Sequence, residues 1–285
     1  MKLISHDDLD GVVSAVLLSL KFKTNNIHFQ DSNKSFKANK NTIISDLPYE
    51  KGTFLWFDHH ISHKTNQKFK GKFALEKSCA RVIYDYYNKK FPKYYEELVV
   101  QTDKADSGDY SLKDIKTYNF IYLLDRIGFL SPFNNEKERQ LYLKTMFTHF
   151  KEQKPIKDLL KNKDIKKFID RVKKIDKKSL EFIKKYGRIN KKTLIIDSSD
   201  KERIFNPFYI YTKYLDCKYM MIITKRGDKL GILLIFNKFY PNKNHSNIGE
   251  ILKKYGGGGH SVIGGCRIYI KNKKRVVKEI LNKLK

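Results

Sequence analysis

The stretch Ile4-Ser5-His6-Asp7-Asp8-Leu9-Asp10-Gly11 decides how the start of this chain folds. Residues 2–5 form a short apolar run suited to a strand, and residues 12–22 carry apolar side chains at helical spacing. The turn between them therefore holds one imidazole and three carboxylates. Because crowded carboxylates repel one another unless a cation neutralises them, the stretch predicts a divalent-metal site. The alternative is that Asp10 caps the helix and the rest is a solvated loop.

Further predicted strands alternate with predicted helices. Strands are expected at 27–30, 41–45 and 53–57, and helices at 76–89 and 94–104. The alternation predicts an α/β fold with a mostly parallel sheet and helices on both faces.

The predicted strands end in groups that can bind a metal ion. Asp46 follows the strand at 41–45, and Asp58-His59-His60 follows the strand at 53–57. Parallel sheets bind ligands at the carboxyl ends of their strands. We therefore expect one crevice to collect the following side chains: His6, Asp8, Asp10, Asp46, Asp58, His59 and His60.

The remainder of the first half is predicted to be helical. A turn carries Asp103, Asp106 and Asp109, of which one could complete the metal site while the others serve as turn or cap residues. Residues 112–186 have a helical pattern, and their lysines between 151 and 185 are interpreted as a solvated face. The predicted domains are 1–150, a helical connector at 151–187, and a smaller α/β domain at 188–285.

The last hundred residues contain a glycine run, Gly256 to Gly259, followed by His260. Glycines permit positive φ and close backbone approach, so Gly257, Gly258, Gly259 and His260 are predicted to bind a phosphate. A flexible hinge is the alternative. His245, before a predicted helix at 248–255, could contact substrate, or its neighbours could simply cap that helix.

Composition restricts the class of protein. The chain has 285 residues and no apolar run near the length of about 20 residues needed to span a membrane. It begins in a predicted strand, without the features of a secretory signal. Cys79, Cys217 and Cys266 are odd in number and widely spaced, which indicates a reducing, cytoplasmic setting and argues against zinc or a disulfide framework.

The net charge is strongly positive. Lys and Arg number 59 against 31 Asp and Glu, giving a formal charge of +28. Such a field attracts polyphosphates and nucleic acid. The abundance of Lys, Asn and Ile together is also typical of a chain encoded by an AT-rich genome, so the charge favours an anionic substrate without identifying it.

Other residues receive structural interpretations. His28, His63 and His149 have no acidic residue at ligand spacing and are predicted to be surface or core histidines. Trp56 and Cys79 are predicted to be buried.

Taken in order, His-x-Asp-x-Asp-Gly, a strand-end Asp, Asp-His-His, Asp-Ser-Gly and Gly-Gly-Gly-Gly-His resemble the DHH phosphoesterase family over nearly the whole chain. That family includes RecJ exonucleases, nano-RNA-degrading oligoribonucleases and cyclic-dinucleotide phosphodiesterases. The resemblance implies a DHH domain, a connector and a DHH-associated domain.

The resemblance also implies roles for single residues. His6 and Asp8 would hold one metal ion, Asp10 the other, and Asp46 would bridge them. His59 would be a ligand, Asp58 would support the loop, and His60 would touch the metal shell or the phosphate. Asp106 aligns with the last metal-binding Asp of the family, and Asp103 is the alternative.

The predicted activity is hydrolysis of short single-stranded oligonucleotides. Two divalent ions can activate a water molecule toward phosphorus, and the mixed carboxylate and imidazole ligands favour Mn²⁺, with Mg²⁺ as the alternative. A second enzymatic prediction is hydrolysis of a small phosphate compound: a cyclic or linear dinucleotide, pyrophosphate or a 3′-phosphorylated nucleotide. A non-catalytic nucleic-acid-binding module is the third alternative. The oligomeric state, including a homodimer, is left open.

Overall fold

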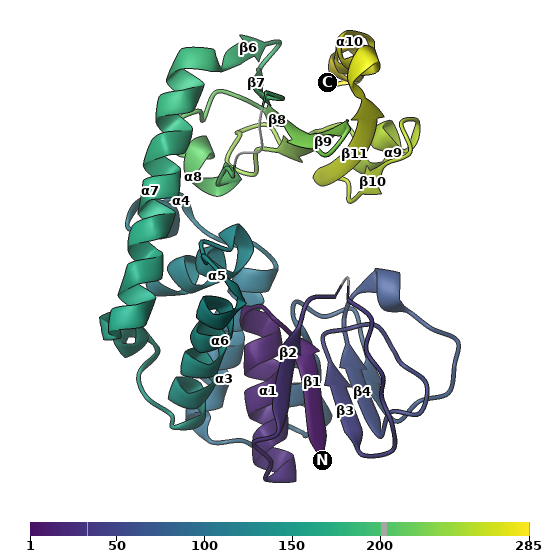
Figure 1. Ribbon diagram of the computed structural model, residues 1–285, viewed down its shortest axis with the longest axis vertical. Helices are drawn as coiled ribbons and strands as arrows, with labels where there is room; N and C mark the ends of the chain where they lie inside the picture. Colours follow the sequence, from purple (N-terminus) through teal and green to yellow (C-terminus); the bar gives the residue numbers. More distant parts are fainter. Residues whose placement is uncertain (33, 201–203, 285) are drawn as a thin grey trace. The chain divides into compact units, whose positions relative to one another are not determined.

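The computed structural model describes residues 1–32, 34–200 and 204–284. The chain forms two compact units, Met1–Val172 and Lys173–Lys285, and each is described by itself (Figure 1). The division between the units falls within helix α7 (Lys163–Tyr186), so the predicted connector contributes to both of them.

The first unit is built on a five-stranded sheet in which every pairing is parallel. Its strand order is β2-β1-β3-β4-β5, with bounds β1 (Lys2–His6), β2 (Ile27–Gln30), β3 (Thr42–Ser45), β4 (Leu55–Asp58) and β5 (Gly71–Phe73). The predicted parallel α/β architecture is therefore confirmed. Strand β5 was not predicted, because its three residues have too little alternation to be distinguished from a loop.

Helix α1 (Leu9–Phe22) lies at the centre of this unit and packs on the sheet and on other helices. All residues from Leu9 to Ser19 are buried, which explains why its apolar residues are not confined to one stripe. The remaining helical segments of the unit are α2 (Cys79–Tyr86), α3 (Lys93–Asp106), α4 (Leu112–Lys116), α5 (Phe120–Leu130), α6 (Glu136–Lys151) and the 3₁₀ turns η1 (Ile61–His63) and η2 (Ile156–Lys161).

The opposite face of the sheet is covered differently. Ile4, Ile44 and Trp56 are paired across β1, β3 and β4 and form one apolar cluster. The partly buried residues packed on this cluster come from loops and from β5: Phe36, Ala38, Tyr49, Phe69 and Phe73. In this cluster, loops take the place of the helices expected on the second face, because the connection after β2 is too polar to form an amphipathic helix.

The second unit contains a six-stranded mixed sheet of order β10-β11-β9-β8-β7-β6. Its strands are β6 (Arg188–Asn190), β7 (Thr193–Ser198), β8 (Tyr219–Arg226), β9 (Lys229–Phe236), β10 (Gly258–Gly259) and β11 (Ile263–Tyr269). The helical segments are α8 (Pro207–Tyr211), α9 (Ile248–Lys253), η3 (Ile270–Asn272) and α10 (Lys273–Lys283). The short elements β6, β10 and α8 were not predicted.

Each face of this second sheet has its own core. One cluster includes Met221, Ile232 and Leu252 and receives α9 and α10. The other includes Ile183, Leu194 and Ile210 and receives α8 and the end of α7. Among the described residues, no helix has the length and apolar character needed to cross a membrane.

Candidate metal centre

The turn from β1 to α1 is shaped by Asp8 and Gly11. Asp8 is the N-cap of the helix, and its Oδ1 accepts a hydrogen bond of 2.9 Å from the amide of Gly11. The alternative that Asp10 caps the helix is therefore wrong. A Cβ atom on Gly11 would lie 2.1 Å from the carbonyl oxygen of His6, so glycine is needed for the turn to close. The closed turn places Nδ1 of His6 2.7 Å from Oδ2 of Asp8.

Asp10 points away from the cap and into the unit. Its two carboxylate oxygens accept hydrogen bonds from the first two amides of α2, Cys79 N at 2.7 Å and Ala80 N at 2.9 Å. A helix N-terminus favours a negative charge. Helix α2 therefore fixes the orientation of Asp10.

Asp46 lies at the end of β3 in a left-handed backbone conformation, with φ of 59°. Its side chain is 1% exposed, yet neither carboxylate oxygen makes a hydrogen bond. Oδ2 lies 3.5 Å from Nδ1 of His6, and Oδ1 lies 3.6 Å from Nε2 of His59. A buried carboxylate without a partner is costly, so this position is suited to a cation between the two imidazoles.

Asp58 holds the loop that follows β4. Its Oδ1 accepts hydrogen bonds from the amides of His59 and His60 and from Nδ1 of His60 at 2.9 Å. Burial alone would raise the pKa of Asp58, but its hydrogen bonds with the histidines outweigh that effect and lower the pKa to about 2. Asp58 thus remains charged and orients both histidines.

His59 is oriented as a ligand. Its Nδ1 donates to the carbonyl oxygen of Glu76 at 3.1 Å, which leaves Nε2 as the nitrogen that could bind a metal ion. Nε2 is buried, makes no hydrogen bond, and lies 3.4 Å from Oδ2 of Asp106 and 3.7 Å from Oδ2 of Asp10.

The two candidate aspartates of α3 have different surroundings. Asp103 accepts hydrogen bonds from Nε and Nη2 of Arg81 at 2.9 and 2.7 Å and from the hydroxyl of Ser78 at 2.6 Å. Its charge is therefore already neutralised. Asp106 instead faces His59, so it is the better placed of the two to complete a metal site.

These side chains form overlapping groups that could hold metal ions. Within each group the ligand atoms lie within 4.8 Å of one another. One group is His6, Asp8 and Asp46; a second is Asp10, His59 and Asp106; a third contains Asp46, Asp58, His59 and His60. Asp46 and His59 each belong to two groups. The residues fit divalent ions, because unsatisfied buried oxygens and nitrogens of the kinds that bind Mn²⁺ or Mg²⁺ meet here.

The pKa values of the side chains in the crevice show that negative charge is concentrated there. Burial and the charge of Asp8 raise the pKa of Asp10 to about 6, although His59 acts in the opposite direction. Burial and the nearby carboxylates of Asp10 and Asp8 raise the pKa of Asp46 well above its usual range. Burial lowers the pKa of His6, but Asp8 and Asp46 outweigh this effect and raise it to about 12. The raised pKa values of Asp10 and Asp46 reflect burial and repulsion between carboxylates, and a bound cation would relieve the same repulsion.

Comparison with solved structures finds this fold in other proteins. The pGpG-specific phosphodiesterase PggH from Vibrio cholerae is 26% identical, with a TM-score of 0.80 over 99% of this chain and 97% of that one. A DHH domain described as a member of the s1p family of ribosomal proteins is 12% identical, with a TM-score of 0.59 over 98% and 85% of the two chains. No family model and no curated protein matches the sequence.

The chain has the fold of the DHH-family phosphoesterases over nearly its whole length. Its neighbours include a phosphodiesterase and RecJ exonucleases, and they support the prediction of a metal-dependent phosphoesterase. RecJ from Thermus thermophilus in complex with Mn²⁺ shares the fold, with 12% identity and a TM-score of 0.58 over 99% of this chain and 51% of RecJ. The same RecJ has also been seen in complex with Mg²⁺.

Two residues that contact acidic side chains of the candidate metal centre or its neighbours were not identified from the sequence. Nδ1 of His63 lies 2.5 Å from Oδ2 of Asp58, so the expectation that His63 lacks an acidic partner is wrong. Arg139 of α6 forms an ion pair of 2.6 Å with Asp7, which is 7% exposed. The position of His63, five residues after Asp58, was an available signal. The pairing of Arg139 with Asp7 depends on tertiary structure, so the sequence contained no signal for it.

The glycine run lies in the second unit of the chain. Gly258 and Gly259 form β10, the edge strand beside β11, and Gly259 has φ of 138°. A Cβ on Gly257 would lie 2.3 Å from the carbonyl oxygen of Gly265, so tight packing on β11 requires glycine there. A flexible hinge is therefore excluded.

Much of the backbone in this run is already hydrogen-bonded. The amides of Gly256, Gly257 and His260 donate to the carbonyl oxygens of Lys253, Leu252 and Ile263, at 3.1, 3.1 and 2.7 Å. These three amides are not free to bind a phosphate as expected. The exposed imidazole of His260 remains available.

His245 precedes α9 and is half-buried. Its ring lies 4.5 Å from that of Phe236, and its Nδ1 donates to the carbonyl oxygen of Ser246 at 3.1 Å. The cap of α9 is Asn247, whose Oδ1 accepts from the amide of Glu250 at 3.1 Å. Backbone hydrogen bonds from Ile248 to Ser261 and from Gly249 to His260, both 3.0 Å, join the start of α9 to the end of the glycine run.

Proposed function

We propose that the chain is a phosphodiesterase that hydrolyses linear dinucleotides and other very short oligonucleotides with two divalent metal ions. The observation that carries the proposal is Asp46, a fully buried carboxylate with no hydrogen bond, which lies between His6 and His59. Mn²⁺ suits the mixed ligands best, and Mg²⁺ is the alternative.

The ligand assignment follows from the distances. His6 and Asp8 would hold one ion, Asp10, His59 and Asp106 the other, and Asp46 would serve both. Bound divalent ions supply Lewis acidity toward a phosphoryl oxygen and lower the pKa of water. Asp10 stays in place because helix α2 holds both its oxygens, and His59 stays in place through the carbonyl of Glu76.

His60 would act on the substrate. Burial lowers the pKa of His60, but the hydrogen bond and the charge of Asp58 outweigh that effect and raise it. With Nδ1 bound to Asp58, a protonated His60 can donate from Nε2 to a phosphate oxygen. Asp58 would orient His60 and preserve its charge. His63 shares this carboxylate and would hold Asp58 from the other side.

The substrate class rests on the comparison and on charge. A protein that matches 99% of this chain is described as specific for pGpG, a linear dinucleotide. The formal charge of +28 favours polyanionic substrates. In the second unit, His260 and His245 would contact the substrate. We propose the functional division 1–150 for catalysis, 151–187 as a connector and 188–285 for substrate binding.

A substrate panel tests the proposal. With Mn²⁺, the full chain should convert pGpG to mononucleotides at a kcat/KM at least about tenfold above that for a five-nucleotide RNA, because a site that fits a dinucleotide would bind the transition state of the longer chain less well. Pyrophosphate, a cyclic dinucleotide and a 3′-phosphorylated mononucleotide should be poor substrates. Product release is measured by chromatography of the reaction mixture.

In the same assay the D46N variant should lose activity, and D85N provides its matched control, since Asp85 is 42% exposed on α2 and this change should leave turnover intact. If pyrophosphate or the cyclic dinucleotide were hydrolysed faster than pGpG, the proposed substrate class would be contradicted. Binding of RNA without cleavage of any of these compounds would favour the non-catalytic module.

A further inference from the structure

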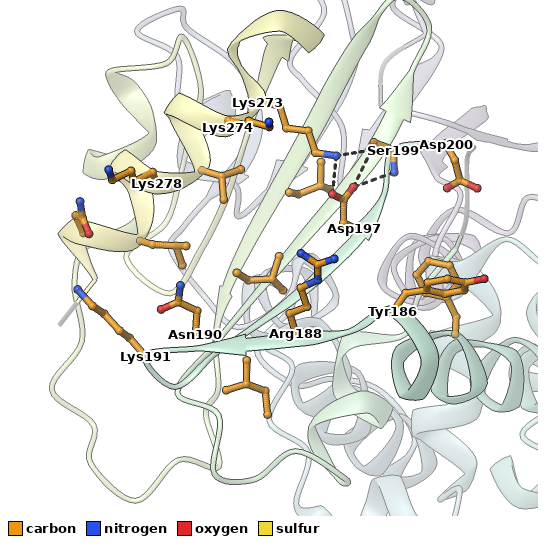
Figure 2. Close-up of a pocket in the computed structure, with 17 residues that line it drawn as sticks. Tyr186, Arg188, Asn190, Lys191, Asp197, Ser199, Asp200, Lys273, Lys274 and Lys278 are labelled. Carbon is orange, nitrogen blue, oxygen red and sulfur yellow. Dashed lines mark hydrogen bonds and ion pairs between the residues drawn. The ribbon is translucent and has the colours of Figure 1, made fainter.

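The second unit contains a pocket of about 1250 Å³ between α10 and the β6–β7 edge of the sheet (Figure 2). Arg188, Ile195 and Asp197 contribute from the sheet, and Lys274 and Lys278 from α10. The end of α7 contributes Phe182 and Tyr186. The pocket exists because α10 covers the central strands and leaves the face of β6 and β7 beside it open.

This pocket is distinct from the glycine run. Strand β10 is at one edge of the six-stranded sheet and β6 is at the other. Five strand spacings of about 4.8 Å place these edges roughly 24 Å apart. A ligand in the pocket would therefore not occupy the position beside the glycine run where we propose that His260 contacts the substrate.

The charges that line the pocket are mostly positive and only partly neutralised. Five cationic and two acidic side chains line it. Lys273 pairs with Asp197 at 2.5 Å and donates to the hydroxyl of Ser199 at 2.6 Å, as Figure 2 shows. Across the described parts of the chain, the other four cations have no ion pair: Arg188, Lys191, Lys274 and Lys278. Four unpaired cations on facing walls favour a ligand with several negative charges.

The pocket also has an aromatic end. Tyr186 is 49% exposed, and its ring lies 4.8 Å from that of Phe182. In Figure 2, Tyr186 lies at one side of the pocket, Lys191 and Lys278 lie at the other, and Arg188 is between them. Between these ends the lining is aliphatic, from Ile195 and Val277 among others. An exposed aromatic ring beside aliphatic groups can stack on a nucleobase.

We propose that this pocket binds a nucleoside polyphosphate, with the base on Tyr186 and the phosphates between Arg188 and the lysines of α10. The clustering of the aromatic rings at one end favours a single nucleotide. A bound nucleic-acid strand would instead need aromatic side chains repeated along a basic groove. The proposal does not depend on the hydrolytic activity of the first unit.

The test is a calorimetric titration of the full chain with ATP in EDTA. Because no divalent ion is then present, the acidic crevice of the first unit should repel the nucleotide. ATP should bind, inorganic triphosphate should bind more weakly, and adenosine should not bind. The double variant K274E/K278E should weaken ATP binding by at least about tenfold, because it replaces attraction on one wall with repulsion. Y186A should remove the advantage of ATP over inorganic triphosphate.

Two control variants separate this site from general electrostatics and from the glycine run. K174E/K178E makes the same charge change at the same spacing on exposed positions of α7, and it should alter ATP affinity by less than about twofold. H260A should have no effect. Equal loss in both double variants, loss in H260A, or tighter binding of a 5′-phosphorylated oligonucleotide than of ATP would overturn the proposal.

Discussion

Replacement of Asp46 by asparagine is expected to reduce turnover of pGpG at least about a thousandfold, because the carboxylate proposed to serve both metal ions is lost. Asparagine has nearly the same volume and tolerates the left-handed conformation of this residue, whose φ is 59°. The fold should therefore survive. Single-turnover kinetics with Mn²⁺ measure the loss.

The same variant should be more stable than the wild-type chain when metal is absent. Asp46 is buried among Asp10 and Asp8, and burial together with their repulsion raises its pKa well above the usual range. Removal of this carboxyl group should raise the free energy of unfolding by about 1 kcal/mol in EDTA at neutral pH. Chemical denaturation measures this change. Lower stability in EDTA together with normal turnover would contradict the assigned role of Asp46.

Replacement of Gly11 by alanine is expected to have the largest effect on stability. The new Cβ would lie 2.1 Å from the carbonyl oxygen of His6, and backbone cannot move as a flexible side chain can. The turn must therefore open, and we expect a loss of at least about 3 kcal/mol in the free energy of unfolding. His6 and Asp8 would shift with the turn, so turnover should fall at least about a hundredfold in the protein that remains folded.

Gly128 provides the matched control for this change. It lies in helix α5, and a Cβ there would meet nothing within 4 Å. Alanine at this position should raise the free energy of unfolding by about 0.5–1 kcal/mol, because glycine disfavours a helix interior. If G11A and G128A had equal effects on unfolding by urea, the account of the turn would be wrong.

The candidate metal centre could be predicted from the sequence because its residues follow directly after strands. His6, Asp46 and His59 are far apart in the chain, but each comes at the carboxyl end of a parallel strand, and β1, β3 and β4 are neighbours. Adjacent parallel strands bring such ends together whatever the loops between them do.

The parts that could not be predicted depend on tertiary contacts. The preference for Asp106 over Asp103 rests on Arg81, which pairs with Asp103 across 22 residues of sequence. The three-residue strands β5 and β6 are too short for a hydrophobic pattern. In the glycine run, the sequence was compatible with phosphate binding, whereas packing against Gly265 accounts for part of the glycine requirement.

We expect a pair of divalent ions to be held together by His6, Asp8, Asp10, Asp46, His59 and Asp106. Crystals of the full chain grown with Mn²⁺ and measured at the manganese absorption edge test it directly. We expect two anomalous peaks about 3.5–4 Å apart, with Asp46 bound to both. A single peak or no peak in this crevice, or two peaks without Asp46 as a ligand, would contradict this assignment.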